Sequence, residues 1–168
     1  KELNFDESEI NEFCHLMQDI GGRKGRFLAQ FPPSIKIAKL DQIHLLLENF
    51  KKYNSSKSWN LALVMRDSSW YCPEFYALLK KYNATIVMHD MQQSETGWEI
   101  PIGNHVYLRF HGPEGRYRGS YSNEFLKTIA GKIKKWIHEG KSVYTYFNNT
   151  IGSAYENLLT LNEYVLRK

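Results

Sequence analysis

The sequence predicts an α/β fold in which parallel β-strands are joined by α-helices, in a single domain over residues 1–168. Five short apolar runs with strand character alternate with five segments of helical periodicity. Strands that alternate with helices in this way are parallel and are joined by right-handed crossovers. The chain is 42% hydrophobic and 24% charged, as a globular domain is, and it has neither an internal repeat nor a linker.

The first half of the chain is predicted to open on a helix. Asp6 and Glu9 have the spacing of a capping box, which starts a helix, and Gly21-Gly22 ends it. A short strand over 26–30 stops before Pro32-Pro33, because proline cannot continue a ladder of hydrogen bonds. The elements expected next are a helix over 39–53, a strand over 60–66, a helix over 73–82 and a strand over 84–89.

The second half is predicted to begin with a polar loop over 91–104. The elements expected after it are a strand around Tyr107, a helix over 122–138, a strand around Tyr146 and a last helix that ends at Leu166. Apolar residues trace one face of the helix over 122–138, and we expect burial of Phe125, Ile129, Ile133, Trp136 and Ile137. The opposite face is expected to expose Lys127, Lys132, Lys134 and Lys135.

Two of the predicted strands divide into an apolar face and a polar face, because successive strand residues point to opposite sides of a sheet. In the first, the apolar residues Val106, Leu108 and Phe110 oppose Tyr107, Arg109 and His111. In the second, Val143, Thr145 and Phe147 oppose Tyr144, Tyr146 and Asn148. Each strand is therefore expected to pack helices on one side and to line a polar space on the other.

These polar segments resemble a known family. The ordered motifs are Tyr107-x-Arg109-x-His111-Gly112, then Tyr117-Arg118-Gly119-x-Tyr121-Ser122, then Tyr146-Phe147-Asn148-Asn149. Upstream, Gln30-Phe31-Pro32-Pro33-Ser34 and Arg66-x-x-Ser69-Trp70 agree with the same family. The chain is similar to the YecE-like family, domain of unknown function 72, from about Phe5 to its C-terminus. The resemblance implies a TIM-barrel-like fold and a site, but no established reaction.

The number of strands leaves two architectures open. A closed (β/α)8 barrel needs eight strands and typically ~250 residues, whereas this chain has 168 residues and five predicted strands. The first interpretation is a partial TIM-barrel-like domain whose N-terminal strands are missing from the chain. The alternative is a complete five-stranded doubly wound sheet. We favour the partial barrel, because five ordered motifs are stronger evidence than the strand count.

Polar residues follow all five predicted strands. They are Gln30, then Arg66 and Asp67, then His89 and Asp90, then Arg109 and His111, then Asn148 and Asn149. Parallel strands present functional groups at their C-terminal ends, so these side chains are candidates for one site. Each also has a structural interpretation. Asp67 and Asn149 could cap the segments that follow, His89 could be a wall residue, and the two arginines could form structural ion pairs.

The candidate site is suited to an anionic ligand and to proton transfer. Arg66 and Arg109 would hold phosphate or carboxylate, because a guanidinium fork binds such groups through two hydrogen bonds. The other expected substrate-binding residues are Gln30, Tyr107, Tyr117, Tyr146, Asn148 and Asn149. His111 is the candidate general acid or base, with Asp67 or Asp90 as its partner. We expect Gly112 to turn the chain sharply and expose the imidazole of His111.

No cofactor is identified by the sequence. His89, Asp90 and His111 could bind a metal, but the chain has no HxxxH, HxH or CxxC spacing to support one. The net charge of +4 is modest, so nucleic acid is a possible partner rather than an indicated one. No apolar run approaches the length of a membrane span, so no membrane partner is expected, and the oligomeric state is left open.

Two functional hypotheses follow. The first is a cytoplasmic TIM-barrel-like enzyme that acts on a phosphorylated or otherwise anionic substrate, for which a nucleic-acid backbone is one candidate. The second is a non-catalytic module that binds an anionic ligand or nucleic acid. The resemblance bears on this choice, because the family usually has Glu two residues before the arginine at the strand end, where this chain has Val64. Loss of a catalytic Glu would favour the second hypothesis, and loss of a merely structural partner would free Arg66 for an external anion.

Overall fold

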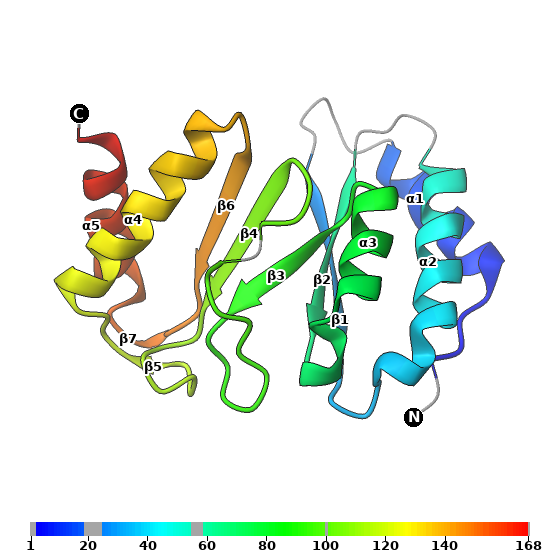
Figure 1. The fold of residues 1–168 in the computed structure, drawn as a ribbon, viewed down its shortest axis with the longest axis horizontal. Helices are drawn as coiled ribbons and strands as arrows, with labels where there is room; N and C mark the ends of the chain where they lie inside the picture. Colours follow the sequence, from blue (N-terminus) through cyan, green and yellow to red (C-terminus); the bar gives the residue numbers. More distant parts are fainter. Residues whose placement is uncertain (1–2, 19–24, 55–58, 100, 168) are drawn as a thin grey trace. The chain divides into compact units, whose positions relative to one another are not determined.

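Strands and helices alternate along most of the chain as the sequence predicts, but the strands Thr85–His89 and His105–Phe110 follow each other with no helix among the described residues between them. The computed structural model describes residues 3–18, 25–54, 59–99 and 101–167. By their internal contacts they divide into unit 1, Lys1–Thr85, and unit 2, Ile86–Lys168. Five parallel strands, two paired in unit 1 and three in or entering unit 2, confirm the α/β class (Figure 1). The expectations of a single domain and of a TIM barrel stay predictions.

Among the described helices, none is both long and apolar enough to cross a membrane.

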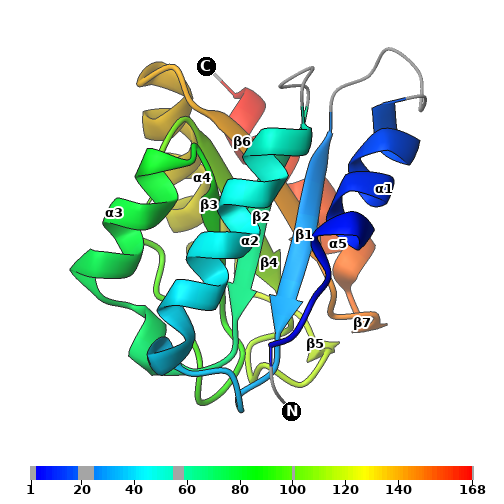
Figure 2. The same cartoon turned by 90° about the vertical axis from the view of Figure 1, so that its right-hand side faces the viewer.

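Unit 1 consists of two parallel strands and the helices around them. Strands β1 (Arg26–Phe31) and β2 (Asn60–Met65) pair in a register that aligns Gln30 with Val64. The helices are α1 (Glu7–Gln18), α2 (Leu40–Tyr53) and α3 (Pro73–Lys81), with short 3-10 turns η1 (Ile37–Lys39) and η2 (Ser68–Trp70). Helices α1 and α2 lie side by side (Figure 2). Each strand and α-helix of unit 1 begins within two residues of its expected start, whereas the two 3-10 turns were not predicted.

The ends of the unit 1 elements are set by local hydrogen bonds. The predicted capping box forms, since the backbone N–H of Asp6 donates to Oε2 of Glu9 at 3.1 Å. Glu7 joins the first two helices, because its carboxylate accepts from Nζ of Lys52 at 2.7 Å and from the hydroxyl of Tyr53 at 2.6 Å. The predicted stop at Gly21-Gly22 lies outside the described residues.

Unit 2 is built on three parallel strands, β3 (Thr85–His89, entering from the last residue of unit 1), β4 (His105–Phe110) and β6 (Ser142–Phe147). Helices α4 (Asn123–His138) and α5 (Ala154–Leu166) pack against each other. The sequence did not predict the short parallel pair β5 (Arg118–Gly119) and β7 (Ile151–Gly152). A Cβ on Gly152 would lie 2.3 Å from the carbonyl oxygen of Gly119, so glycine is required there.

The two faces of the unit 2 sheet differ as predicted. The apolar face packs on α4 and α5, where it forms one core from Met88, Val106, Leu108, Phe110, Leu126, Ile129, Ala130, Ile133, Trp136 and Leu161 (Figure 1). On the other face the register places Tyr107 opposite Tyr144 and Arg109 opposite Tyr146. The period-2 alternation of β4 and β6 therefore separates a hydrophobic core from a face of Tyr and Arg.

Helix α4 begins where the sequence predicts, but one of its residues is not buried as predicted. The side chain of Ser122 caps the helix by accepting from the backbone N–H of Phe125 at 3.2 Å. Ile129, Ile133 and Trp136 are buried as predicted, and Phe125 is half-buried. The burial predicted for Ile137 is wrong, because its side chain is 51% exposed. Neighbouring helix residues point about 100° apart, so Trp136 and Ile137 cannot both face the sheet. Of the predicted lysines, Lys132 is half-buried and the other three are exposed.

We predict that Trp136→Ala destabilises the chain by about 3–5 kcal/mol, because it leaves a cavity in the core against α4. Ile137→Ala is the matched control and should change the free energy of unfolding by less than about 0.5 kcal/mol, as exposed positions do. Denaturant unfolding of both variants checks this. Equal losses for the two variants would contradict the face assignment of α4.

Candidate functional site

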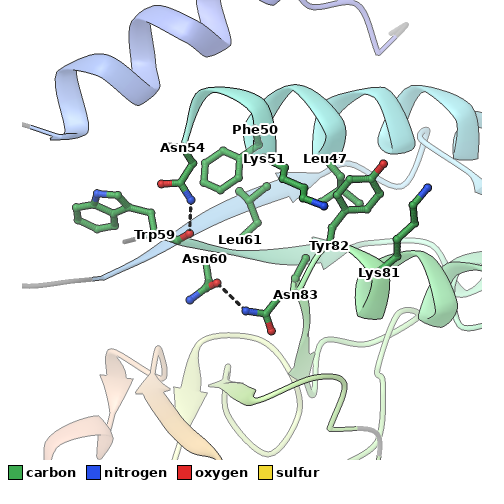
Figure 3. Close-up of a pocket in the computed structure, with 11 residues that line it drawn as sticks. Leu47, Phe50, Lys51, Asn54, Trp59, Asn60, Leu61, Lys81, Tyr82 and Asn83 are labelled. Carbon is green, nitrogen blue, oxygen red and sulfur yellow. Dashed lines mark hydrogen bonds between the residues drawn. The ribbon is translucent and has the colours of Figure 1, made fainter. Parts of the chain in front are cut away.

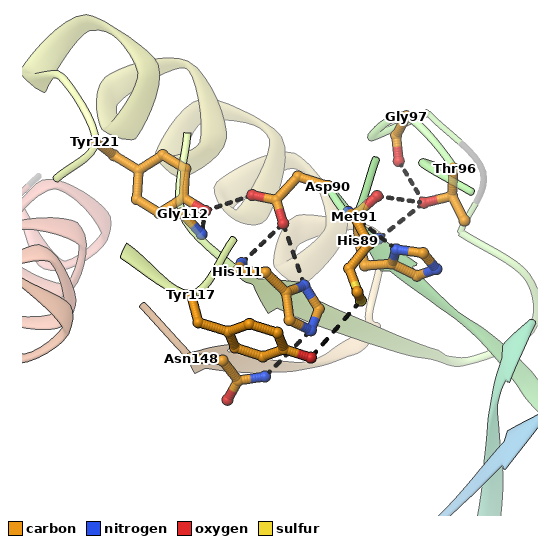
Figure 4. Close-up of polar contacts among 10 residues, drawn as sticks. All are labelled: His89, Asp90, Met91, Thr96, Gly97, His111, Gly112, Tyr117, Tyr121 and Asn148. Carbon is orange, nitrogen blue, oxygen red and sulfur yellow. Dashed lines mark hydrogen bonds and ion pairs between the residues drawn. The ribbon is translucent and has the colours of Figure 1, made fainter. Parts of the chain in front are cut away.

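The candidate site of unit 2 lies where β3, β4 and β6 end. Asp90 follows β3, His111 follows β4 and Asn148 follows β6. Because the strands are parallel, their C-terminal ends lie at one edge of the sheet, and the three side chains meet there (Figure 4). The structure thus brings together three of the residues predicted from the sequence.

The carboxylate of Asp90 is the centre of this cluster. Its Oδ1 accepts from the backbone N–H of His111 at 2.7 Å and lies 3.2 Å from Nδ1 of the same residue. Its Oδ2 accepts from the hydroxyl of Tyr121. Nδ1 must carry a proton to donate to a carboxylate, so this contact favours the Nδ1–H tautomer and leaves Nε2 directed away from Asp90.

Tyr121 extends the network to the turn after β4. Its hydroxyl accepts from the buried backbone N–H of Gly112 at 2.6 Å and donates to Asp90. Burial raises the pKa of Tyr121 well above its usual value, and the hydrogen bond to Asp90 raises it further. The hydroxyl therefore keeps its proton and stays a hydrogen-bond donor at neutral pH.

The imidazole of His111 is enclosed, with none of its side chain exposed. Gly112 does make the expected sharp turn, with φ +101° and the carbonyl oxygen of Arg118 only 2.1 Å from a hypothetical Cβ. The expectation that this turn exposes the imidazole is wrong. The turn brings Tyr117 back over the imidazole instead, with ring centroids 5.2 Å apart and planes at 89°. Tyr117 has a positive φ of 64°, which is rare for a residue with a side chain.

Asn148 connects His111 with Arg109. One amide orientation places Nδ2 3.4 Å from Nε2 of His111. The opposite orientation places Oδ1 at the same point, where it accepts from Nε and Nη2 of Arg109 at 3.0 and 2.9 Å. The first orientation donates to an unprotonated Nε2, as the Nδ1–H tautomer requires, and the second matches a ring whose Nε2 has also taken a proton. The amide therefore lies against a guanidinium fork and an imidazole nitrogen at the same time.

Three tyrosines form a column on the polar face of the sheet. The rings of Tyr107 and Tyr146 stack with centroids 4.8 Å apart and planes at 17°, and Tyr107 and Tyr144 lie 6.4 Å apart at 25°. Burial raises the pKa of Tyr107, and the neighbouring Tyr146 adds to the effect. Tyr107 is buried, whereas 44% of Tyr146 is exposed. The column thus ends in an accessible ring.

His89 and Asn149 make structural contacts within unit 2, but the cap predicted for Asn149 is wrong, because its Oδ1 accepts no hydrogen bond from the described part of the chain. His89 is buried, its ring Nδ1 accepts from the backbone N–H of Met91 at 3.3 Å, and its backbone N–H donates to Thr96 at 2.8 Å. Asn149, also buried, donates to the carbonyl oxygen of Gly119 at 2.9 Å and to Asn157 at 3.0 Å. A ligand contact by Asn149 stays a prediction.

The other predicted site residues belong to unit 1. Asp67 caps η2 by accepting from the backbone N–H of Ser69 at 3.0 Å, and hydrogen bonds from Ser69 lower the pKa of its carboxyl group. Arg66 is partly buried and Gln30 is exposed, at the ends of β2 and β1. Val64 is fully buried within β2. The role of these residues in a site shared with unit 2 stays a prediction.

A cavity of about 380 Å³ in unit 1 contains none of the predicted site residues (Figure 3). It lies between α2, the start of β2 and the end of α3. Lys51 and Lys81 stand over the ring of Tyr82 at 5.6 and 5.2 Å. Both lysines lie in the last turns of their helices, where a positive charge complements the helix dipole. The positions of the two lysines are thus explained by Tyr82 and by the helix ends, and the candidate site stays at the C-terminal ends of the unit 2 strands. Among the described residues, no group of three His, Cys, Asp or Glu side chains is placed to hold a metal.

Sequence reasoning missed two residues that support the site, Tyr121 and Asn157. Tyr121 belongs to one of the family motifs, but nothing in the neighbouring sequence indicates that it reaches a carboxylate 31 positions earlier. The side chain of Asn157 is buried in α5, where it accepts from the backbone N–H of Tyr121 at 3.2 Å. An Asn on the buried face of a helix is a detectable signal, because a buried amide needs partners.

We predict that Tyr121→Phe lowers the free energy of unfolding by about 1–3 kcal/mol, because it leaves the N–H of Gly112 and an oxygen of Asp90 without a partner. Tyr117→Phe is the matched control, since its hydroxyl makes a long contact of 3.9 Å to the sulfur of Met91. It should change stability by less than about 0.5 kcal/mol. Thermal unfolding of both variants measures the difference, and an unchanged Tyr121→Phe protein would contradict the network.

Comparisons with known proteins place the chain in a family. A family model described as "Protein of unknown function DUF72" matches residues 1–168. No curated protein matches the chain significantly.

Solved structures agree with the family match. A DUF72 family protein from Enterococcus faecalis V583 is similar with a TM-score of 0.75 at 22% identity, over 98% of this chain and 67% of that chain. A DUF72 family protein from Thermotoga maritima MSB8 is similar with a TM-score of 0.72 at 26% identity, over 96% of this chain and 66% of that chain. The chain thus spans about two thirds of the length of these relatives. With the family model matching along its length, the chain belongs to the DUF72 family of proteins of unknown function, the YecE-like family that its motifs resemble.

Proposed function

We propose that the chain is part of an enzyme that acts on a phosphorylated or otherwise anionic substrate at the C-terminal ends of β3, β4 and β6. Arg109 and Asn148 bind the anionic group, and His111 transfers a proton with Asp90 as its partner. The observation that carries the proposal is the position of the Asn148 amide, which lies against both the Arg109 guanidinium and Nε2 of His111.

The contacts of Asn148 indicate how an anion would bind. Its Oδ1, in the orientation that accepts from Nε and Nη2 of Arg109, occupies the place that one oxygen of a phosphate or carboxylate would take in a guanidinium fork. Rotation of the Asn148 side chain would open this place to a ligand. The same rotation would uncover Nε2 of His111, so a bound anion and the imidazole would meet.

The Asp90 contacts support a role in proton transfer. A carboxylate on Nδ1 holds an imidazole in one tautomer and stabilises the imidazolium that forms when Nε2 takes a proton. Two further hydrogen bonds to Asp90 hold the carboxylate in place, one from the backbone of His111 and one from Tyr121. The geometry thus suits a general base whose reactive nitrogen points toward the anion.

We predict that Arg109→Lys weakens binding of a phosphate monoester, such as ribose 5-phosphate, by roughly ten- to a hundredfold. The ammonium keeps the charge but loses the fork, and a charge-assisted hydrogen bond contributes about 1.5–3 kcal/mol. Arg116→Lys is the matched control, an exposed arginine of the same unit, and should leave the affinity unchanged. Calorimetric titration of the three proteins measures this. Arg66→Lys in the same titration tests whether the second arginine contributes.

We predict that His111→Asn leaves the affinity for the phosphate monoester within about threefold and lowers any turnover at least a hundredfold, because the amide cannot transfer a proton. Hydrolysis of p-nitrophenyl phosphate is a suitable first assay. Full turnover by His111→Asn would exclude the proposed role. A large loss of stability in Arg109→Ala with no change in affinity would show that the arginine is structural.

A second candidate function, a non-catalytic module for an anionic ligand, is favoured by the complete enclosure of His111. A ring without access to a ligand would only hold the turn after β4 in place. The two candidates differ in turnover, since the module binds the monoester without changing it. If the anion belongs to a nucleic-acid backbone, the affinity for a short single strand should fall steeply between about 50 and 200 mM salt, because phosphate contacts release counterions.

A further inference from the structure

The accessible ring of Tyr146 lies beside the proposed anion site. Tyr146 is directly opposite Arg109 in the register of β4 and β6, so both side chains leave the same face of the sheet. Neighbouring strands lie ~4.8 Å apart. One ligand of moderate size can therefore contact the guanidinium and the ring together.

The ring of Tyr146 is held in place from behind. Its inner face stacks on Tyr107 with centroids 4.8 Å apart and planes at 17°, and Tyr107 is buried. With 44% of Tyr146 exposed, its outer side remains available. A rigid aromatic face of this kind loses little conformational freedom when a second flat ring stacks on it.

A surface cavity borders Tyr146. A cavity of about 320 Å³ in unit 2 lies beside the end of β6 and the start of α5, and it is lined by Tyr146 and Asn148 together with Thr145, Phe147, Ala154, Tyr155 and Leu158. Tyr155 is 68% exposed and adds a second aromatic side chain to the wall. The same cavity includes Asn148, the residue that contacts Arg109. Arg109 itself does not line this cavity, so Asn148 is the residue that links the cavity to the anion site.

We propose that the substrate of this site is a nucleotide, whose base stacks on Tyr146 and whose phosphate binds to Arg109. The inference rests on the proposed function and names its substrate class. A nucleotide combines a flat ring system and a phosphate, the two groups that Tyr146 and Arg109 recognise. The amide of Asn148, with both donor and acceptor atoms, lies against Arg109 and lines the same cavity as Tyr146, so it suits the polar edge of a base.

The test uses calorimetric titration with three probes, adenosine monophosphate, ribose 5-phosphate and inorganic phosphate. We expect adenosine monophosphate to bind about tenfold or more tightly than ribose 5-phosphate, because stacking of a base adds to phosphate binding. Tyr146→Leu should remove this difference and leave the affinity for ribose 5-phosphate unchanged. Tyr146→Phe, which keeps the ring, should retain it.

The outcomes separate this inference from the proposed function. Equal affinities for adenosine monophosphate and ribose 5-phosphate would overturn the nucleotide and leave the anion site intact. Equal losses for both probes in Tyr146→Leu would also overturn it, since the ring would then have no part in base binding. Failure of all three probes to bind would overturn the proposed function and the inference together. Unfolding midpoints of both Tyr146 variants, expected to lie near that of the original chain, confirm that the comparison is between folded proteins.

Discussion

The carboxylate of Asp90 is the group on which the arrangement of unit 2 depends. It accepts hydrogen bonds from the backbone of His111 and from the hydroxyl of Tyr121, and it faces Nδ1 of His111. These contacts join the end of β3 to the turn after β4 and to the residue that precedes the cap of α4. A buried polar group without a partner is costly, so the N–H of His111 and the hydroxyl of Tyr121 need this carboxylate as much as it needs them. The orientation of the imidazole follows from this mutual requirement.

The division of β4 into two faces explains how one strand serves both stability and chemistry. Val106, Leu108 and Phe110 are buried against α4 and α5, whereas Tyr107 and Arg109 point to the opposite side. The helices therefore fix the strand without using its polar side chains. Beyond the strand, Gly112 allows the chain to fold back so that Tyr117 covers His111. Arg109 and Tyr146 leave the polar face of the sheet opposite α4 and α5, which is why we place the ligand there and not against Tyr117.

Patterns of neighbouring residues predicted the helices and strands well, because helix caps and the two faces of a strand depend on residues close in the sequence. The predicted capping box at Asp6 forms, the helix expected over 122–138 begins there with Ser122 as its cap, and the period-2 pattern of β4 and β6 gives the correct faces. The sequence could not predict contacts between distant segments. Tyr121 reaches Asp90 across 31 positions, and β5 pairs with β7 because two glycines allow close approach. The enclosure of His111 was missed for the same reason, since it depends on Tyr117 folding back. The burial of Ile137 was predicted wrongly, because apolar character alone does not show which of two adjacent helix residues faces the sheet.

The tautomer of His111 is the most direct test of the central claim that Asp90 orients this imidazole. A long-range proton–nitrogen correlation spectrum of the histidine rings, with His111 assigned by its absence in His111→Asn, reports which nitrogen is protonated. The contact between Nδ1 and the Asp90 carboxylate predicts that the neutral ring carries its proton on Nδ1 and leaves Nε2 free to accept one. A neutral ring protonated on Nε2 would contradict the account, because the carboxylate would then face a nitrogen lone pair and could not hold the ring.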